Sequence, residues 1–229
     1  MKCTILQPGY LPWLGFFDQM AQSDVFVMYD DVQYTRRDWR SRNRIKTAKG
    51  VCWLTVPVKT RGRRYQLVNE ARVDNSRPWQ RKHVETIRGS YSNAPYFKRY
   101  FPQIRSILEK DPPLLMDLNL ELIQYLRQVL NLKTKIIFSS TMDIQGNRTE
   151  RLVKICKALG AREYLTGDAA ASYLEMEMFD QHDIEVHFHK YKHPEYPQIN
   201  GPFIPYLSAI DLVFNCGPES RSYIAGRET

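Results

Sequence analysis

Long apolar runs, paired cysteines and a leader-like start are all missing from this chain of 229 residues. No apolar run approaches the roughly 20 residues that a membrane-spanning helix needs, so we expect no membrane span. The first residues lack the basic, apolar and small-residue order of a signal peptide, which predicts a cytoplasmic protein. The four cysteines lie far apart without a C-x-x-C pair. We therefore expect neither a disulfide framework nor a zinc site.

The motifs of several enzyme classes are also absent. The chain has no P-loop, no complete G-x-G-x-x-G, no H-E-x-x-H and no nucleophile elbow. The usual sequence signals of P-loop NTPases, dinucleotide-binding domains, zinc proteases and α/β-hydrolases are thus missing. The sequence identifies no cofactor.

Positive charge is abundant and unevenly distributed. The net charge is +8, and the segment from Arg36 to Arg64 is rich in arginine and lysine but holds only one acid, Asp38. Such a cluster indicates an anionic partner: phosphate, nucleotide, nucleic acid or acidic lipid. A solvated loop is the alternative, but arginine outnumbers lysine here, and arginine suits bidentate contacts with phosphate or carboxylate.

Short apolar segments predict an α/β fold with a mostly parallel, open sheet of the nucleotide-binding type. Strands are expected at Lys2–Leu6, Val25–Tyr29, Val51–Val58, Lys135–Phe138, Glu163–Leu165 and Ile184–Phe188. A helix over Leu14–Gln22 joins the first two strands and completes a βαβ unit. Three further helices are expected near Asn75–Arg88, Tyr96–Lys110 and Leu114–Leu130. We therefore predict one domain, residues 1–229, with a helical insertion at about 74–130.

The segment after the first predicted strand is the most informative one. Pro8, Gly9 and Pro12 make a rigid loop before the helix, and the loop offers the side chains of Gln7, Tyr10 and Trp13. Backbone N–H groups at the helix start suit an anion, and a Pro/Gly loop allows close approach. A βα turn that needs its prolines only for shape is the alternative.

Two acidic residues follow the second predicted strand. Asp30 and Asp31 are suited to bind a cation, act as a base or hold a substrate amine. In extended backbone they point to opposite faces, so at most one enters a site. Asp31 is equally suited to an ion pair with Arg36 or Arg40. Further along, Trp39, Asn43 and Arg44 offer contacts to a base, a sugar or a phosphate.

Two later segments complete the candidate site. Thr166, Gly167 and Asp168 follow another predicted strand, and His193 and Tyr196 lie beyond the last one. Because parallel strands present their carboxyl ends at one edge of the sheet, we expect these residues to converge with Gln7–Trp13 and Asp30–Arg44 on one cleft. His193 is the candidate general base, with a pKa near the working range.

Two other patterns have simpler explanations. Glu185, His187 and His189 share one strand face, which suggests metal ligands, but a half-exposed strand explains the same row and no metal site is predicted. Ser208 and Asp211 have the spacing of a helix start.

The chain resembles the WbqC-like family through several motifs in the same order. These are Gln7-Pro-Gly-Tyr-Leu-Pro-Trp-Leu-Gly15, Asp30-Asp-Val-Gln-Tyr34, Arg42-Asn-Arg-Ile45, Trp53-Leu-Thr-Val-Pro57, His193-Pro-Glu-Tyr196 and Leu207-Ser-Ala-Ile-Asp-Leu-Val-Phe-Asn215. Members of this family are encoded among genes for O-antigen and related surface polysaccharides. A role in transferring glycine to an amino sugar has been proposed for them, so the resemblance implies that setting and, more weakly, that reaction.

A fainter similarity links the chain to nucleotide-binding α/β folds that adenylate their substrates. Those proteins carry H-x-G-H at the first helix, where this chain has Trp13-Leu-Gly-Phe16. Both histidines are missing, which argues against ATP cleavage even if the fold is shared.

Together these observations predict a transferase that adds glycine or another acyl group to a nucleotide-linked amino sugar. The acyl donor is an acyl adenylate, a thioester or an aminoacyl-tRNA. His193 or Asp31 is the expected base, and Tyr10 and Asn43 are the expected polar contacts to the reacting group. Binding of the substrate is assigned to Gln7, Trp13, Arg37, Arg40, Arg44, Thr166, Gly167, Asp168 and Tyr196, with the arginines on the diphosphate.

The alternative is a basic RNA- or tRNA-binding module without catalysis. In that hypothesis the arginine cluster contacts phosphates, and Tyr34, Trp39 and Trp53 offer stacking surfaces. No RNA-binding motif is present to support it further.

Overall fold

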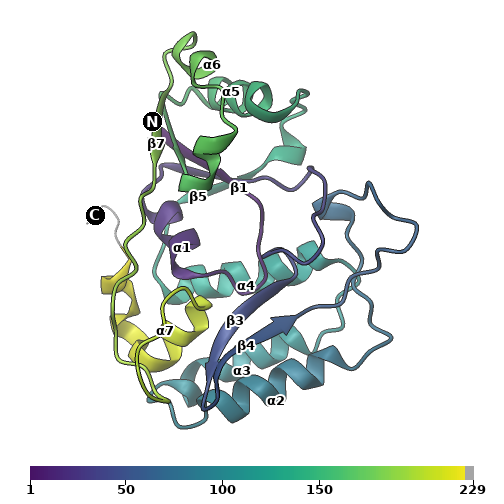
Figure 1. The fold of residues 1–229 in the computed structure, drawn as a ribbon, viewed down its shortest axis with the longest axis vertical. Helices are drawn as coiled ribbons and strands as arrows, with labels where there is room; N and C mark the ends of the chain where they lie inside the picture. Colours follow the sequence, from purple (N-terminus) through teal and green to yellow (C-terminus); the bar gives the residue numbers. More distant parts are fainter. Residues whose placement is uncertain (225–229) are drawn as a thin grey trace.

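The computed structural model describes residues 1–224 and contains an open, parallel five-stranded sheet (Figure 1). The sheet has the order β5-β2-β1-β6-β7, and each neighbouring pair is parallel. The strands are β1 (Lys2–Leu6), β2 (Val25–Met28), β5 (Lys135–Phe138), β6 (Glu163–Thr166) and β7 (Glu185–Phe188). The predicted α/β fold with a mostly parallel sheet is confirmed, as is the βαβ unit formed by β1, α1 (Leu14–Ala21) and β2.

The strand order places a topological switch between β1 and β6. The chain first moves outward from β1 through β2 to β5, then returns to the other side of β1 for β6 and β7. The register sets Thr4 of β1 beside Leu165 of β6, so both strands end at the same edge. The loops after β1 and β6 are therefore neighbours, although about 160 residues separate them in the sequence.

Both faces of the central strands are buried, which explains their short apolar sequences. Cys3, Ile5, Val25 and Val27 face a core that includes α5 (Arg148–Leu159) and α6 (Met176–Asp180). On the other face, Phe26 and Met28 join a larger core that includes α1. These alternating contacts follow the two-residue repeat of a strand.

The segment between β2 and β5 forms a second layer of structure. It begins with an antiparallel hairpin, β3 (Arg42–Thr47) and β4 (Gly50–Thr55), which stands apart from the main sheet and packs on α2. Three helices follow: α2 (Trp79–Tyr91), α3 (Phe97–Leu108) and α4 (Leu115–Val129). They fall within the expected helical segment 74–130, whereas β3 was not predicted. Within residues 1–224, no helix has both the length and the apolar composition needed to cross a bilayer.

Helix starts were predicted less accurately than strands. Ser208 does cap α7 (Ala209–Cys216), where its hydroxyl accepts from the Ile210 N–H. The helix expected to start near Asn75 instead begins after Pro78. Local capping signals near prolines and turns place a start only to within a few residues.

Asp211 is not a capping residue, because its carboxylate lies in a buried polar network. It accepts hydrogen bonds from the hydroxyls of Tyr91 (2.7 Å) and Tyr196 (2.8 Å) and from the Gln198 amide (2.8 Å). The ammonium group of Lys46, 1% exposed, donates to Gln198 Oε1 at 3.1 Å and to two carbonyls of the same segment. The network joins β3, α2 and α7 to the long segment after β7, residues 189–208, which descends along the left of Figure 1.

Candidate functional site

The loop between β1 and α1, residues 7–13, is held in a strained conformation. Leu11 has a φ of 44°, which bulky residues rarely adopt. The Asn43 amide donates to the carbonyls of Leu11 (2.8 Å) and Tyr10 (3.2 Å), and the Tyr10 N–H donates to the Trp39 carbonyl (3.0 Å). Backbone strain of about 1–3 kcal/mol persists only where the surroundings impose it, and such strain clusters at functional sites.

Replacing Asn43 with alanine should release this loop. Two buried carbonyls would lose their donor, so we expect the free energy of unfolding to fall by about 2–3 kcal/mol. Urea unfolding followed by circular dichroism measures the change. Asn93→Ala, at an exposed position between α2 and α3, is the control and should change stability by less than about 0.5 kcal/mol. If the two variants behave alike, the loop does not depend on the amide.

Aromatic rings border the first turn of α1. An added Cβ at Gly15 would lie only 2.2 Å from the Trp13 ring, so no larger side chain fits there without moving that ring. Tyr191 meets the Trp13 ring edge-on with centroids 5.0 Å apart, and Tyr206 lies at 5.8 Å. Trp13 is thus fixed between the helix start and the segment after β7.

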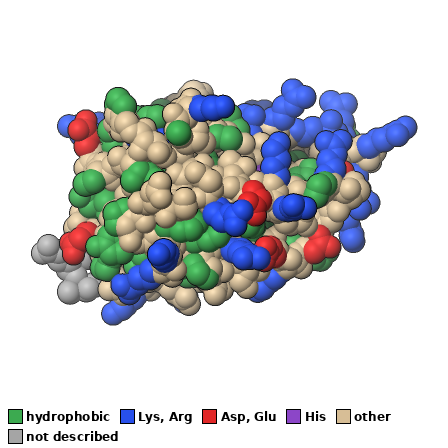
Figure 2. All heavy atoms as spheres, turned by 90° about the horizontal axis from the view of Figure 1, so that it is seen from below, with side chains coloured by type: hydrophobic (Ala, Val, Ile, Leu, Met, Phe, Trp, Pro, Cys, Tyr) green, Lys and Arg blue, Asp and Glu red, His purple; other side chains and the backbone are tan. Residues whose placement is uncertain are grey.

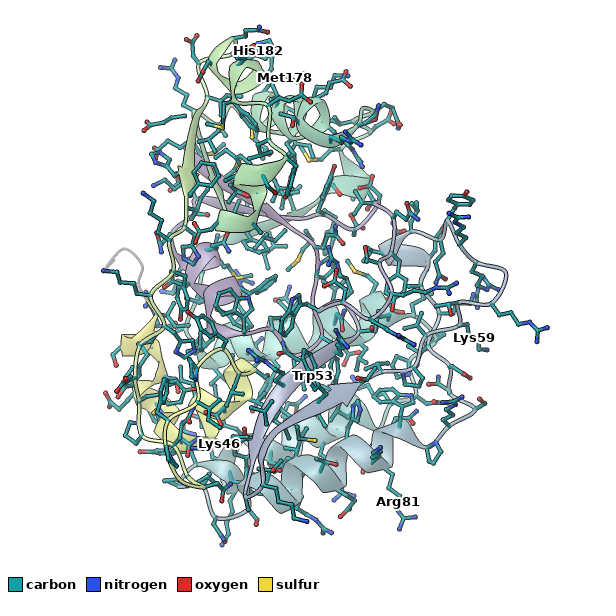
Figure 3. The ribbon with its side chains drawn as sticks, viewed as in Figure 1. Lys46, Trp53, Lys59, Arg81, Met178 and His182 are labelled. Carbon is teal, nitrogen blue, oxygen red and sulfur yellow. The ribbon has the colours of Figure 1, made fainter. Side chains whose placement is uncertain are left out.

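Two exposed tryptophans lie side by side beside this loop and form what we term the tryptophan platform, Trp39 and Trp53. Their ring centroids are 5.3 Å apart, and the residues are 45% and 43% exposed. The Arg44 guanidinium lies 5.7 and 5.8 Å from the two rings, and that of Arg42 lies 4.4 Å from Trp53. Trp53 is labelled near the centre of Figure 3. The platform combines stacking surface with positive charge.

Tyr206 connects the tryptophan platform to His193. The Tyr206 carbonyl accepts from Arg44 at 2.9 Å, and its ring lies 5.2 Å from that of His193. Tyr206 is 44% exposed and has a φ of 59°, a second strained residue of this region. It therefore touches Trp13, Arg44 and His193 at once.

His193 and Tyr191 each hold a buried polar atom without a partner. The Nδ1 of His193 lies 2.8 Å from the Pro194 carbonyl, which can only accept, so Nδ1 carries the proton and Nε2 is free to accept. Nε2 and the Tyr191 hydroxyl are buried and bonded to nothing among the described residues. The two rings lie 5.7 Å apart. Burial lowers the pKa of His193 and raises that of Tyr191, so both side chains favour their neutral forms.

The structure places several predicted residues at the carboxyl edge of the sheet. Arg40 donates to the Gln7 side chain at 2.6 Å and also pairs with Asp38. Gly167 lies on the other side of the switch point. A Cβ added to Gly167 would have no atom within 4 Å, so a ligand can approach the backbone here. Asp168 accepts from the Lys190 N–H at 3.0 Å.

Two other predicted binding residues differ in accessibility. Thr166, at the end of β6, is 3% exposed, so its side chain is not available to a ligand. Arg37 is exposed, has a φ of 55° and pairs with none of the described acidic residues.

Three of the residues predicted to contact the substrate have side chains that are buried and bonded to other parts of the protein. Tyr10 is 0% exposed, and its hydroxyl is bonded to His83 at 2.8 Å. Tyr196 is 5% exposed and donates to Asp211. Asn43 is 2% exposed, and its amide holds the loop after β1 rather than a ligand. All three side chains instead hold neighbouring segments of the protein in place.

Asp31 also differs from its predicted role as a base. Its carboxylate pairs with Arg151 of α5 and accepts from the Ser139 hydroxyl at 2.5 Å. The predicted partners Arg36 and Arg40 bind elsewhere. Asp30 turns to the same segment, accepting from the Ser140 N–H at 3.0 Å. Both carboxylates thus join the ends of β2 and β5 and point away from the loop after β1.

The histidines of the last strand contact different partners. His189 lies 2.5 Å from the Asp18 carboxylate, and both side chains are almost fully buried. His187 lies 3.3 Å from Glu163 and 3.6 Å from Glu185. Among residues 1–224, no group of three or more His, Cys, Asp or Glu side chains is arranged to hold a metal ion.

Sequence comparison identifies the family. A sequence model of the WbqC-like protein family matches residues 7–223. The chain belongs to this family. It is also 38% identical over 225 residues to the uncharacterized protein Rv1507c of Mycobacterium tuberculosis (strain ATCC 25618 / H37Rv), which covers 97% of each chain. No solved structure matches the chain significantly. The family match spans the loop after β1, the tryptophan platform and His193.

Proposed function

We propose that this WbqC-like protein transfers an acyl group, with glycine as the first candidate, to the amine of a nucleotide-linked amino sugar during synthesis of a surface polysaccharide such as O-antigen. The observation that carries the proposal is the unpaired acceptor and donor, His193 Nε2 and the Tyr191 hydroxyl, beside Trp13 and Tyr206. Buried polar atoms are nearly always bonded in proteins, and a substrate group between these two rings would bond to both atoms.

The nucleotide half of the substrate suits the tryptophan platform. An exposed tryptophan stacks well on a base, and the nearby guanidinium groups of Arg42 and Arg44 suit a diphosphate. Ligands of open parallel sheets bind outside the carboxyl ends of the strands at the topological switch. The loop after β1, which carries the Trp39 contact, lies at that switch.

The chemistry assigned to His193 is proton transfer. The amine nitrogen attacks the acyl carbonyl carbon and forms the amide, while its proton passes to His193 Nε2. The bond to the leaving group breaks, and the proton is returned to that group. The Tyr191 hydroxyl, kept protonated by burial, is suited to donate to the developing oxyanion.

Incubation with nucleotide-linked amino sugars tests the reaction directly. Each sugar is offered with three donors in turn: glycine plus ATP, a glycyl thioester, and glycyl-tRNA. A mass gain of one glycyl residue on the sugar, absent with heat-inactivated protein, supports the proposal. No gain with any amino sugar and any donor contradicts it.

Loss of the tryptophan platform should weaken nucleotide binding. Stacking contributes about 1–3 kcal/mol per base, so Trp39→Ala and Trp53→Ala should each raise the Kd of the nucleotide-linked sugar by roughly 5- to 150-fold. Isothermal titration calorimetry measures the Kd. Tyr65→Ala is the matched control, because Tyr65 is 75% exposed but lies on a different loop. Equal effects of all three substitutions would contradict binding at the platform.

A further inference from the structure

A second positively charged surface adjoins the tryptophan platform and shares no residue with it. It consists of the loop from Lys59 to Tyr65 together with Arg36 and Arg37, and we term it the basic arm. The loop projects at the right of Figure 1, and Lys59 is labelled beside it in Figure 3. Lys and Arg side chains also gather at the right-hand end of the face in Figure 2. The proposed sugar site makes no use of the loop.

The basic arm is built as an ordered element. The Arg36 guanidinium donates to the Thr60 carbonyl at 2.7 Å, and the Gln33 amide donates to the Arg64 carbonyl at 3.2 Å. The turn also needs Gly62, which has a φ of 70° with open space around it. These bonds hold two separate segments together, so the charges are presented on a fixed surface.

The charges of the basic arm are not neutralised by the protein. Five arginines of the arm are exposed and form no ion pair with any described acidic residue: Arg36, Arg37, Arg61, Arg63 and Arg64. The nearby acids are already engaged, because Asp38 pairs with Arg40 and Glu70 accepts from the Leu67 N–H. Three of the arginines, with Gln33, Tyr34 and Thr35, line a hollow of about 510 Å³.

Five exposed arginines without an acidic partner are more than a single phosphate needs, so their number favours a chain of phosphates. Tyr65 is 75% exposed, and the Arg64 guanidinium lies 5.6 Å from its ring, so the arm also offers a surface for an unstacked base. No other large apolar residue of the loop is exposed, so the arm has nothing to insert into a bilayer. Residues 37–39 also join the arm directly to the tryptophan platform.

We propose that the basic arm binds the phosphate backbone of an RNA, and that this RNA is the carrier of the acyl group, in the manner of an aminoacyl-tRNA. The second part rests on the proposed transferase function. In the reaction, the ester bond between the glycyl carbonyl and the terminal ribose oxygen breaks and the amide bond forms. The proton taken from the amine ends on the ribose hydroxyl, so no further reactant is needed.

Binding of unacylated bulk tRNA to the full chain tests the docking surface. The variant Arg61→Ala/Arg63→Ala/Arg64→Ala should bind at least about tenfold more weakly than the wild type. Its plot of log K against log salt should lose about 2–3 units of slope, because each lost phosphate contact removes about 0.7–0.9. All three side chains are exposed, so thermal unfolding should be unchanged.

The matched control removes three charges elsewhere. Arg81, Lys82 and Lys98 are exposed on α2 and α3, outside the basic arm, and Arg81 is labelled below Lys59 in Figure 3. Their triple alanine variant should bind tRNA within about twofold of the wild type. Equal weakening by both variants, or no tRNA binding by the wild type, overturns the inference. Stronger loss of binding to phosphatidylserine vesicles than to tRNA would assign the arm to a membrane and overturn it too.

Separate readouts distinguish this inference from the proposed function. The arm variant should still bind the nucleotide-linked sugar with wild-type Kd. Transfer of glycine from a thioester or adenylate but not from glycyl-tRNA would overturn the RNA donor and leave the transferase standing. Specific tRNA binding at the arm with no transfer to any sugar would leave the docking surface standing and contradict the transferase.

Discussion

Replacing Asp211 with alanine is expected to lower the free energy of unfolding by about 3–5 kcal/mol. The carboxylate is 0% exposed and accepts from Tyr91, Tyr196 and Gln198. Without it, three buried donors lose their acceptor at the same time. Lys46, 1% exposed, also loses its favourable charge interaction with Asp211, and a buried charge without a counter-charge is costly.

Two further variants separate the causes of this loss. Asp211→Asn keeps the shape and one acceptor oxygen, so a smaller loss of about 1–3 kcal/mol is expected. Asp180→Ala removes an exposed carboxylate at the end of α6 and should change stability by less than about 0.5 kcal/mol. Urea unfolding of the three variants measures the differences. A loss below about 1 kcal/mol for Asp211→Ala would mean that the network does not hold α7 in place.

The central strands β1 and β2 could be predicted because each buries a short apolar run on both faces. Residues 25–28 read VFVM, and nothing but a buried segment explains such a sequence. β3 escaped prediction because its sequence, RNRIKT, is polar. Asn43 and Lys46 are buried there only through distant partners: the carbonyls of the loop after β1 and the segment near Gln198. Local sequence carries no signal of those partners.

The sequence predicted which loops meet at one edge of the sheet, but not which of their side chains are buried. The parallel direction of the strands brings the loops after β1 and β6 to one edge, as their short apolar sequences suggested. The burial of each tyrosine was hard to predict, because tyrosine occurs both in the core and at the surface. Tyr10 and Tyr196 are buried, whereas Tyr206, which was not predicted, is exposed between Trp13 and His193. The ring contacts and the strained backbone that mark Tyr206 have no counterpart in the local sequence.

Replacing His193 with glutamine is expected to lower kcat of the proposed transfer by about 10²- to 10⁴-fold. Nε2 is the unpaired acceptor of the site, and glutamine fills a similar space without accepting a proton. The Kd of the nucleotide-linked sugar should change little, because the tryptophan platform and Arg44 hold the nucleotide. His182→Gln is the matched control: His182 lies at the far end of the molecule in Figure 3 and should keep wild-type kcat.

The dependence of kcat on pH gives a second readout. Burial lowers the pKa of His193 below its usual 6.5, so the base stays unprotonated at neutral pH. As pH falls through this lowered pKa, Nε2 gains a proton and can no longer accept one, so the wild-type rate should fall on the acidic side. In His193→Gln this acidic limb should disappear and leave a low, flatter profile. An unchanged limb in the variant, or a kcat within threefold of the wild type, would assign the proton transfer to another group.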